Sequence, residues 1–184
     1  MLLKPVAEGM RLSLAAMRAP RDYQRSRVEQ DLSPRAMIGW TVGMLVMLGL
    51  SFHHFVDSAA ISDTAGWILV LLGTLMAFFI GFLVAAACGY MAGLVGSSSS
   101  PSSGVGIVSV VIVSLVLLVY GESAGLFAHE GNRQFMLALM LFVGSAVVSV
   151  ASVSNDNLQD LKTGWLIQAT PWRQQVALII GCVV

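Results

Sequence analysis

Charged side chains are scarce in this chain of 184 residues, where Asp, Glu, Lys and Arg together make up only 11%. Soluble domains usually carry about 25% of them. Hydrophobic residues make up 57% of the chain, and its mean hydropathy is +0.81. The shortage of charge argues against a soluble domain and indicates a membrane protein whose main partner is the lipid bilayer.

Cysteine and histidine are also rare, and this narrows the possible chemistry. The chain has two Cys and three His. Cys88 and Cys182 lie within apolar runs, where thiols are usually small packing groups. No Cys and His cluster has the spacing of a zinc site, and no nucleotide-binding loop or nucleic-acid motif is present. We therefore expect no cofactor, no metal site and no nucleic-acid partner.

The few cations gather near the N-terminus. Seven of the ten Lys and Arg fall within residues 1–36, at Lys4, Arg11, Arg18, Arg21, Arg25, Arg27 and Arg35. Such a bias predicts a cytoplasmic segment, although binding of a lipid or a partner stays open as an alternative. Apolar residues at helical spacing predict an amphipathic helix over 2–18 that lies on the membrane surface.

Four apolar runs without Asp, Glu, Lys or Arg follow this segment and predict an all-α, polytopic membrane domain over 37–184. We expect spans at about 37–55, 67–95, 105–120 and 135–153, and a truncated fifth helix at 171–184. Ser33 before Pro34 is typical of a helix start, and Thr170 before Pro171 repeats the pattern. The chain ends after nine apolar residues, too few to cross a bilayer, so we expect a fragment of a longer protein.

The polar segment 154–175 is predicted to form an interfacial helix after the fourth span, because Asn157 and Asp160 resemble a helix-start pair. With four crossings, the predicted inner segments hold nine Lys and Arg, and the outer segments 56–66 and 121–133 hold one. This distribution predicts a multi-pass protein of the cell (inner) membrane with a cytoplasmic N-terminus.

A run of small, helix-breaking residues, GSSSSPSSGVG, lies at 96–106 between two apolar runs. Non-helical backbone survives at membrane depth only where protein or a water-filled cavity satisfies its N–H and C=O groups. An apolar segment interrupted by Gly and Pro is typical of a transporter binding site. A plain turn between two spans is the alternative, and the residues alone leave both open.

Three stretches of the chain resemble the oligopeptide transporter (OPT) family, which includes the yellow stripe-like transporters. They are CGYMAGLVGSSSSPSSGVGI (88–107), SNDNLQDLKTGWLIQATPWRQQVALIIG (154–181) and RVEQDLSP (27–34), and they are most similar to bacterial members. The resemblance implies secondary active uptake of small peptides or metal chelates, usually coupled to protons. It also implies that this chain works together with the rest of a longer transporter.

The same resemblance indicates which residues matter. The Ser, Pro and Gly signature of the family maps onto a predicted substrate-binding set, Ser98, Ser99, Ser100, Pro101, Ser103 and Gly104. A second signature maps onto a cytoplasmic motif that includes Asn157, Gln159, Asp160 and Lys162, for which a structural elbow is the simplest interpretation.

Proton coupling normally needs an ionisable group that faces a cavity. Only the edges of the spans offer candidates, namely His53, His54, Asp57, Glu122, His129, Glu130, Asp156 and Asp160. His53, His54 and Asp57 could also form a metal-capture patch, but adjacent histidines point in different directions on a helix, and an interfacial loop is the simpler interpretation.

Two alternatives to a transporter remain at this stage. Ser103-Gly104 with His53 or His129 could form the nucleophile and base of an intramembrane serine hydrolase. The chain could also be a membrane scaffold that transports nothing. We expect no enzyme and no catalytic residue, because the serine run makes a Ser and His match easy to find by chance.

Overall fold

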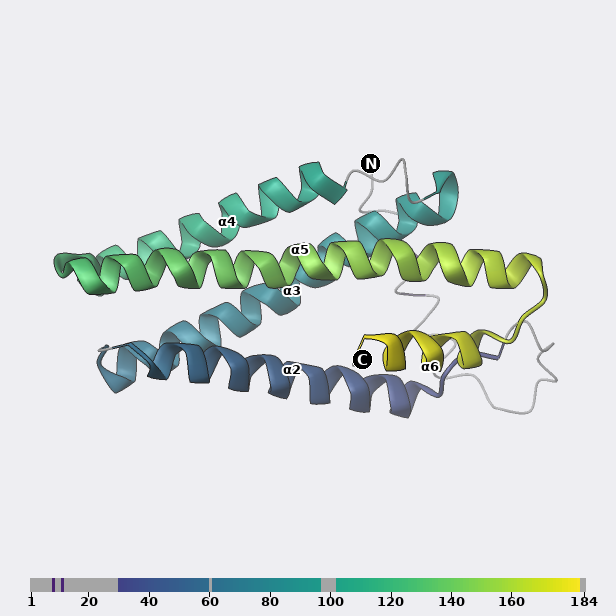
Figure 1. The fold of residues 1–184 in the computed structure, drawn as a ribbon, viewed down its shortest axis with the longest axis horizontal. Coiled ribbons are helices and arrows are strands. Elements are labelled where there is room, and N and C mark those ends of the chain that lie inside the picture. The colour runs from purple at the N-terminus through teal and green to yellow at the C-terminus, as the bar shows by residue number, and fades with distance from the viewer. Residues whose placement is uncertain (1–7, 9–10, 12–29, 60, 97–101, 183–184) are drawn as a thin grey trace.

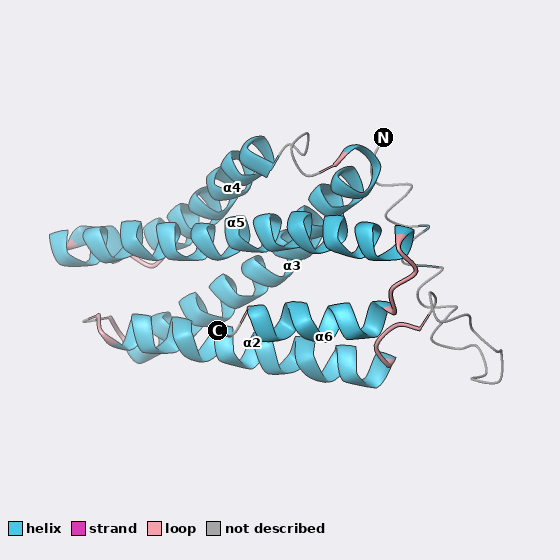
Figure 2. Ribbon diagram, turned by 45° about the vertical axis from the view of Figure 1, so that its right-hand side comes forward, coloured by secondary structure: helices cyan, strands magenta, loops and turns pink. Residues whose placement is uncertain are grey.

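The computed structural model describes residues 8, 11, 30–59, 61–96 and 102–182. Within these ranges the chain is all helical, as expected (Figure 2). The helices are α2 (Pro34–Asp57), α3 (Asp63–Val95), α4 (Ser102–Ser123), α5 (Glu130–Leu166) and α6 (Pro171–Gly181), with a short 3₁₀ turn, η3 (Leu126–Ala128). The helices α2 to α5 are each long and apolar enough to cross a membrane. The helix expected over 2–18 lies almost entirely outside the described residues.

Two of the helix starts follow the sequence signals. Ser33 accepts a hydrogen bond from the Ala36 N–H at 3.3 Å, and Pro34 occupies the first position of α2. This satisfies one of the free N–H groups that every helix start exposes. Pro171 begins α6 as expected, but the Thr170 side chain makes no capping hydrogen bond.

Helix α5 is the centre of the fold, because α3, α4 and α6 all pack against it (Figure 1). Helix α3 crosses α5 obliquely and shares with it the largest interface, and α4 lies on the other flank of α5. Helix α2 packs on the first half of α3, and from this contact the two helices diverge towards the start of α2. Helix α6 turns back beneath the end of α5 and lies beside the start of α2.

Small residues let α3 and α5 approach each other closely. A Cβ placed on Gly73 would lie 3.2 Å from Val143, and one on Gly89 would lie 2.9 Å from the Ser154 hydroxyl. That hydroxyl donates to the Ala85 carbonyl oxygen at 2.8 Å and so joins the two helices directly. Lipid offers no hydrophobic drive for helix association, so close packing and interhelical hydrogen bonds must hold this pair together.

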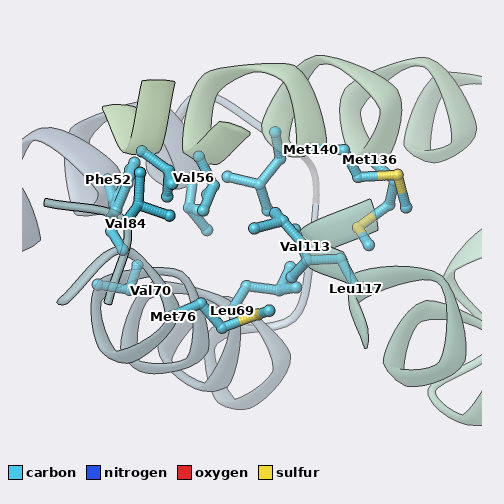
Figure 3. Close-up of a cluster of buried hydrophobic side chains, with 14 of the residues drawn as sticks. Phe52, Val56, Leu69, Val70, Met76, Val84, Val113, Leu117, Met136 and Met140 are labelled. Carbon is cyan, nitrogen blue, oxygen red and sulfur yellow. The ribbon is translucent and has the colours of Figure 1, made fainter. Parts of the chain in front are cut away.

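Helix α4 packs on α5 by the same means. Gly144 of α5 faces Val110 of α4, and Gly106 of α4 faces Val148 of α5, with Cβ separations of 3.0 and 3.3 Å. Buried side chains of α2 to α5 then fill the centre of the bundle, as Figure 3 shows for Phe52, Leu69, Val84, Val113 and Met140.

Helix α2 is held to the bundle mainly through its last turns. Phe52 meets Phe142 edge-on at 5.1 Å between ring centroids, and Phe55 stacks on Phe135 at 5.4 Å. The first half of α2 exposes large apolar side chains, for example Met37, Trp40 and Met44. That half is therefore free to contact lipid or further helices.

One sequence expectation was wrong. The fourth span, predicted at 135–153, is the middle of a helix that continues to Leu166, and no new helix starts at Asn157. No Pro or Gly occurs between Ser145 and Thr163 to end the helix. Ser154 and Asn155 also face protein, and Ser154 is bonded to α3. The polar residues therefore extend the span beyond its apolar part.

Gly89→Ala and Gly93→Ala form a matched pair that tests the α3–α5 contact. The new Cβ at position 89 would displace the Ser154 hydroxyl, whereas nothing lies within 4 Å of a Cβ at position 93. We expect Gly89→Ala to lower the free energy of unfolding by about 1 kcal/mol and Gly93→Ala to raise it by about 0.5 kcal/mol. Equilibrium unfolding in detergent micelles measures both, and an equal response would contradict the predicted contact.

Candidate functional site

The break between α3 and α4 is the site that the sequence indicates. Gly96 ends α3 with φ 91° and ψ 160°, while its N–H still donates to the Ala92 carbonyl oxygen at 3.0 Å. Only glycine adopts this backbone conformation readily. Ser103 and Gly104 lie exposed in the first turn of α4. The remaining predicted residues, Ser98, Ser99, Ser100 and Pro101, lie outside the described residues.

The two helix ends that flank the break lie at different depths along α5. Gly106 of α4 packs against Val148, whereas Gly89 of α3 packs against Ser154 and Leu158. At about 1.5 Å per residue, the end of α3 reaches on the order of 15 Å further along α5 than the start of α4 does. Figure 1 shows the same offset between the end of α3 and the start of α4.

This offset places the first turn of α4 beside the last apolar turns of α5, before the polar segment that begins at Ser154. The first N–H groups of any helix have no partner within it, and the helix dipole makes that end attractive to anions and hydrogen-bond acceptors. Ser109, one turn further, is buried and donates to the Val105 carbonyl oxygen. Ser103 and Gly104 are thus the described residues that the break leaves open to a ligand.

A second polar feature joins residues 30–32 to the start of α6, and we call it the inner junction because the sequence predicts a cytoplasmic position for both segments. The Trp172 N–H donates to the Gln30 carbonyl oxygen at 3.0 Å. Gln175 accepts from the Leu32 N–H at 2.9 Å and donates to an Asp31 carboxylate oxygen at 3.2 Å. The junction connects segments more than 140 residues apart in sequence, and it ties the N-terminal end of α2 to α6.

The turn between α5 and α6 sets the position of the junction. Gln168 adopts a left-handed conformation with φ 60°. The Ala169 N–H donates to the Gly164 carbonyl oxygen and the Gln168 N–H donates to that of Trp165, a hydrogen-bond pattern that commonly closes helices. Gly164 also gives room to Gln174, because a Cβ at position 164 would overlap the Gln174 side chain.

The cytoplasmic motif lies on the last turns of α5 and away from the helix break. Asn157 is half-buried, and Gln159, Asp160 and Lys162 are exposed. The Lys162 ammonium lies 4.8 Å from the centre of the Trp165 ring. The family signature at Asn157 to Gly164 includes Gly164 without indicating its role at the inner junction, and sequence reasoning did not single out Gln175. Both residues lie within the stretch 154–181, and its resemblance to the OPT family was the only sequence signal that pointed to them.

The histidines lie far from the serine-rich break. His53 and His54 are in the last turn of α2, and His129 comes after the end of α4, whereas Ser103 begins α4. Helix α4 has 22 residues, or about 33 Å, between these ends. This arrangement does not bring Ser103 next to a histidine, so the hydrolase alternative is not favoured. Among the described residues, no three His, Cys, Asp or Glu side chains are grouped so that they could hold a metal ion.

Comparison with known proteins shows the family of this chain. Residues 3–184 match the family described as OPT oligopeptide transporter protein. The chain belongs to the OPT family. It is also 52% identical, over 183 residues, to a Haemophilus influenzae protein named "Putative oligopeptide transporter". That match covers 100% of this chain and 29% of the relative, and no solved structure matches the chain. The resemblance drawn from the three sequence stretches is thereby confirmed.

Membership in the OPT family also fits the distribution of polar groups in the described helices. They form a multi-pass membrane bundle, and its polar features include a helix break and a hydrogen-bonded junction. Both features involve stretches that carried the resemblance: 88–107 holds the break, and 27–34 meets 154–181 at the junction. The helix break and the junction are therefore both built from stretches that resemble the OPT family.

Gln175→Leu tests the inner junction while it keeps a side chain of similar size. Loss of the two side-chain hydrogen bonds should weaken the docking of 30–32 on α6 by about 1–2 kcal/mol. We expect amide hydrogen exchange at Leu32 to become on the order of tenfold faster or more. Gln159→Leu, on the exposed face of α5, is the control and should leave that rate unchanged. Unchanged exchange in Gln175→Leu would show that the junction does not form.

Proposed function

We propose that this chain is part of a longer secondary transporter that moves small peptides across the inner membrane. The family match and the name of the relative support peptides as the cargo. Metal chelates, which the family resemblance also implied, are the second cargo class to test. The whole transporter would include the segments of the relative that this chain does not cover.

The proposed orientation places the N-terminus and the inner junction in the cytoplasm. The inner segments would hold nine of the ten Lys and Arg, in keeping with the positive-inside rule. Residues 30–32 and the start of α6 are hydrogen-bonded, so both lie at one end of the bundle, which supports the expected number of crossings. The α2–α3 turn and η3 would then face outwards.

The single observation that carries the proposed substrate path is the offset at the helix break. Helix α4 begins beside the apolar part of α5, and the first N–H groups of a helix have no partner within the helix itself. We propose that Ser98, Ser99, Ser100, Pro101, Ser103 and Gly104 contribute to a polar path at this depth. The carboxylate or the backbone carbonyls of a peptide would supply the missing acceptors.

Alternating access would follow from the uneven attachment of α2. At its outer end α2 is fixed by the aromatic contacts of Phe52 and Phe55. At its inner end it is joined to α6 by a few exposed or half-buried hydrogen bonds, each worth about 1 kcal/mol. In this proposal α2 rocks about the aromatic contacts, and the inner junction opens and closes the cytoplasmic side.

Proton coupling is proposed to use an ionisable group at the edge of a span. The apolar parts of the four spans contain no Asp, Glu, Lys or Arg. The described edges offer His53, Asp57, Glu122 and Glu130 at the outer end and Asp156 at the inner end. Groups in the remainder of the transporter could share this task.

Uptake assays on a full-length transporter that contains this chain test the proposal. Ser103→Leu and Gly104→Leu place bulk at the start of α4 without disturbing a packed contact, since nothing lies within 4 Å of a Cβ on Gly104. We expect each to reduce the uptake of labelled di- to tetrapeptides at least tenfold in the presence of a proton gradient. Ser149→Leu, at an exposed serine of α5, is the matched control and should retain normal uptake.

Several outcomes would contradict parts of this proposal. Normal uptake in Ser103→Leu and Gly104→Leu, at normal membrane levels, would make the break a plain turn. Uptake of iron chelates but not of peptides would change the cargo class. Uptake that is independent of the proton gradient would remove the proposed coupling.

A further inference from the structure

A cavity of about 220 Å³ opens at the outer end of α2 and α3, on the opposite side of the bundle from the inner junction. The lining residues with polar side chains are His53, Asp57, Ser62, Asp63 and Trp67. The cavity is shaped by the close approach of the two helices, because a Cβ on Gly66 would lie 3.2 Å from Val56. The peptide path proposed at the start of α4 does not include this cavity.

The electrostatics of the cavity favour a cation. Asp57 and Asp63 both line it, and no Lys or Arg does. Asp57 is the last residue of α2, where the carboxylate adds to the negative end of the helix dipole instead of opposing it. That placement is unfavourable for the helix, and a positively charged ligand beside Asp57 would offset the repulsion between the carboxylate and the helix dipole.

The other lining groups suit an organic cation. His53 packs against the Trp67 ring at 4.6 Å between ring centroids, and Trp67 remains 61% exposed. An exposed aromatic face attracts ammonium and guanidinium groups. Ser62 precedes α3 without capping it by a side-chain hydrogen bond, so its hydroxyl is available to accept one from a ligand.

A bare metal ion fits the cavity less well than an amine does. His53, Asp57 and Asp63 all line it, yet among the described residues these side chains do not converge as a metal-binding group. A volume of about 220 Å³ also far exceeds that of one ion and is close to that of one amino-acid residue. The sequence also allowed a metal-capture patch of His53, His54 and Asp57. The geometry instead places His53 and Asp57 in a pocket that suits an organic cation.

We propose that this outer pocket binds the ammonium group of an incoming ligand, with Asp57 and Asp63 as its counter-charges and Trp67 as its aromatic wall. The inference rests on the proposed function and adds to it a first binding site for the amino terminus of a peptide. The ammonium group of an aminophospholipid headgroup has the same chemistry, so the experiment must distinguish the two sources.

The test measures uptake kinetics of the full-length transporter in vesicles that contain either phosphatidylcholine alone or phosphatidylcholine with phosphatidylethanolamine. Charge contacts at exposed positions are individually weak. For a tripeptide with a free amino group, the Asp57→Asn/Asp63→Asn double variant should therefore raise KM three- to tenfold. The N-acetylated tripeptide should show no such change. Trp67→Leu should raise KM in the same direction, and Arg133→Gln, an exposed position at the start of α5 and outside the pocket, is the control.

Each outcome has a definite meaning. An equal KM for the wild type and the double variant, with normal uptake of peptides, would overturn the outer pocket and leave the proposed function intact. No uptake of any peptide by the wild type would overturn the proposed function and this inference with it. A KM change that needs phosphatidylethanolamine, and that is equal for free and acetylated peptides, would assign the pocket to the lipid headgroup and overturn its role as a binding site for peptides.

Discussion

The close crossing of α3 and α5 is the constraint on which the rest of the bundle depends. In lipid the apolar surfaces of two helices gain nothing by leaving their solvent, so the gain must come from contact at short range. Gly73 and Gly89 allow that contact because they place no side chain on the α3 face that meets Val143 and Ser154. The hydrogen bond from Ser154 to Ala85 adds a polar tie at the same crossing. The oblique path of α3 across α5 therefore follows from where its glycines stand.

Because α4 uses α5 as well, the crossing also fixes the relation between α3 and α4. Gly144 and Gly106 hold α4 at one level of α5, and Gly89 holds α3 at another. The depth offset at the helix break is a consequence of these two sets of contacts and needs no special feature in the break itself. A shift of α3 along α5 by one turn, about 5.4 Å, would change this offset directly. Motion at the crossing and access to the break are thus physically linked.

The fold could be predicted from the sequence to a large extent. Apolar runs without charged residues predict the spans, and Ser33 followed by Pro34 predicts the start of α2. Both can be recognised in the sequence because each depends only on neighbouring residues. The end of α5 could not be predicted in this way. Asn157 with Asp160 satisfies a local rule for a helix start, but tertiary contacts of the neighbouring Ser154 and Asn155 favour continuation of the helix.

The candidate site was predicted only in part, for a similar reason. The run of Gly, Ser and Pro indicates where a helix breaks, but the depth of the break depends on glycine contacts between helices. The inner junction joins Leu32 to Gln175, and the outer pocket joins Asp57 to Asp63 across a turn. A pairing over 143 residues leaves no local signal. The acidic residues at the turn are visible in the sequence, but their shared cavity is not.

The two proposed binding regions place a limit on how a peptide could move. Helix α4, with its 22 residues, separates the break at its start from the outer end of the bundle by about 33 Å. A fully extended tetrapeptide spans at most about 14 Å. One small peptide therefore cannot contact the outer pocket through its ammonium group and the start of α4 through its carboxylate at the same time. If both regions act in transport, they must act in sequence, so the ammonium group has to leave Asp57 and Asp63 before the carboxylate reaches α4. An outer pocket built from exposed carboxylates meets this requirement, since weak contacts with the ammonium group allow rapid release.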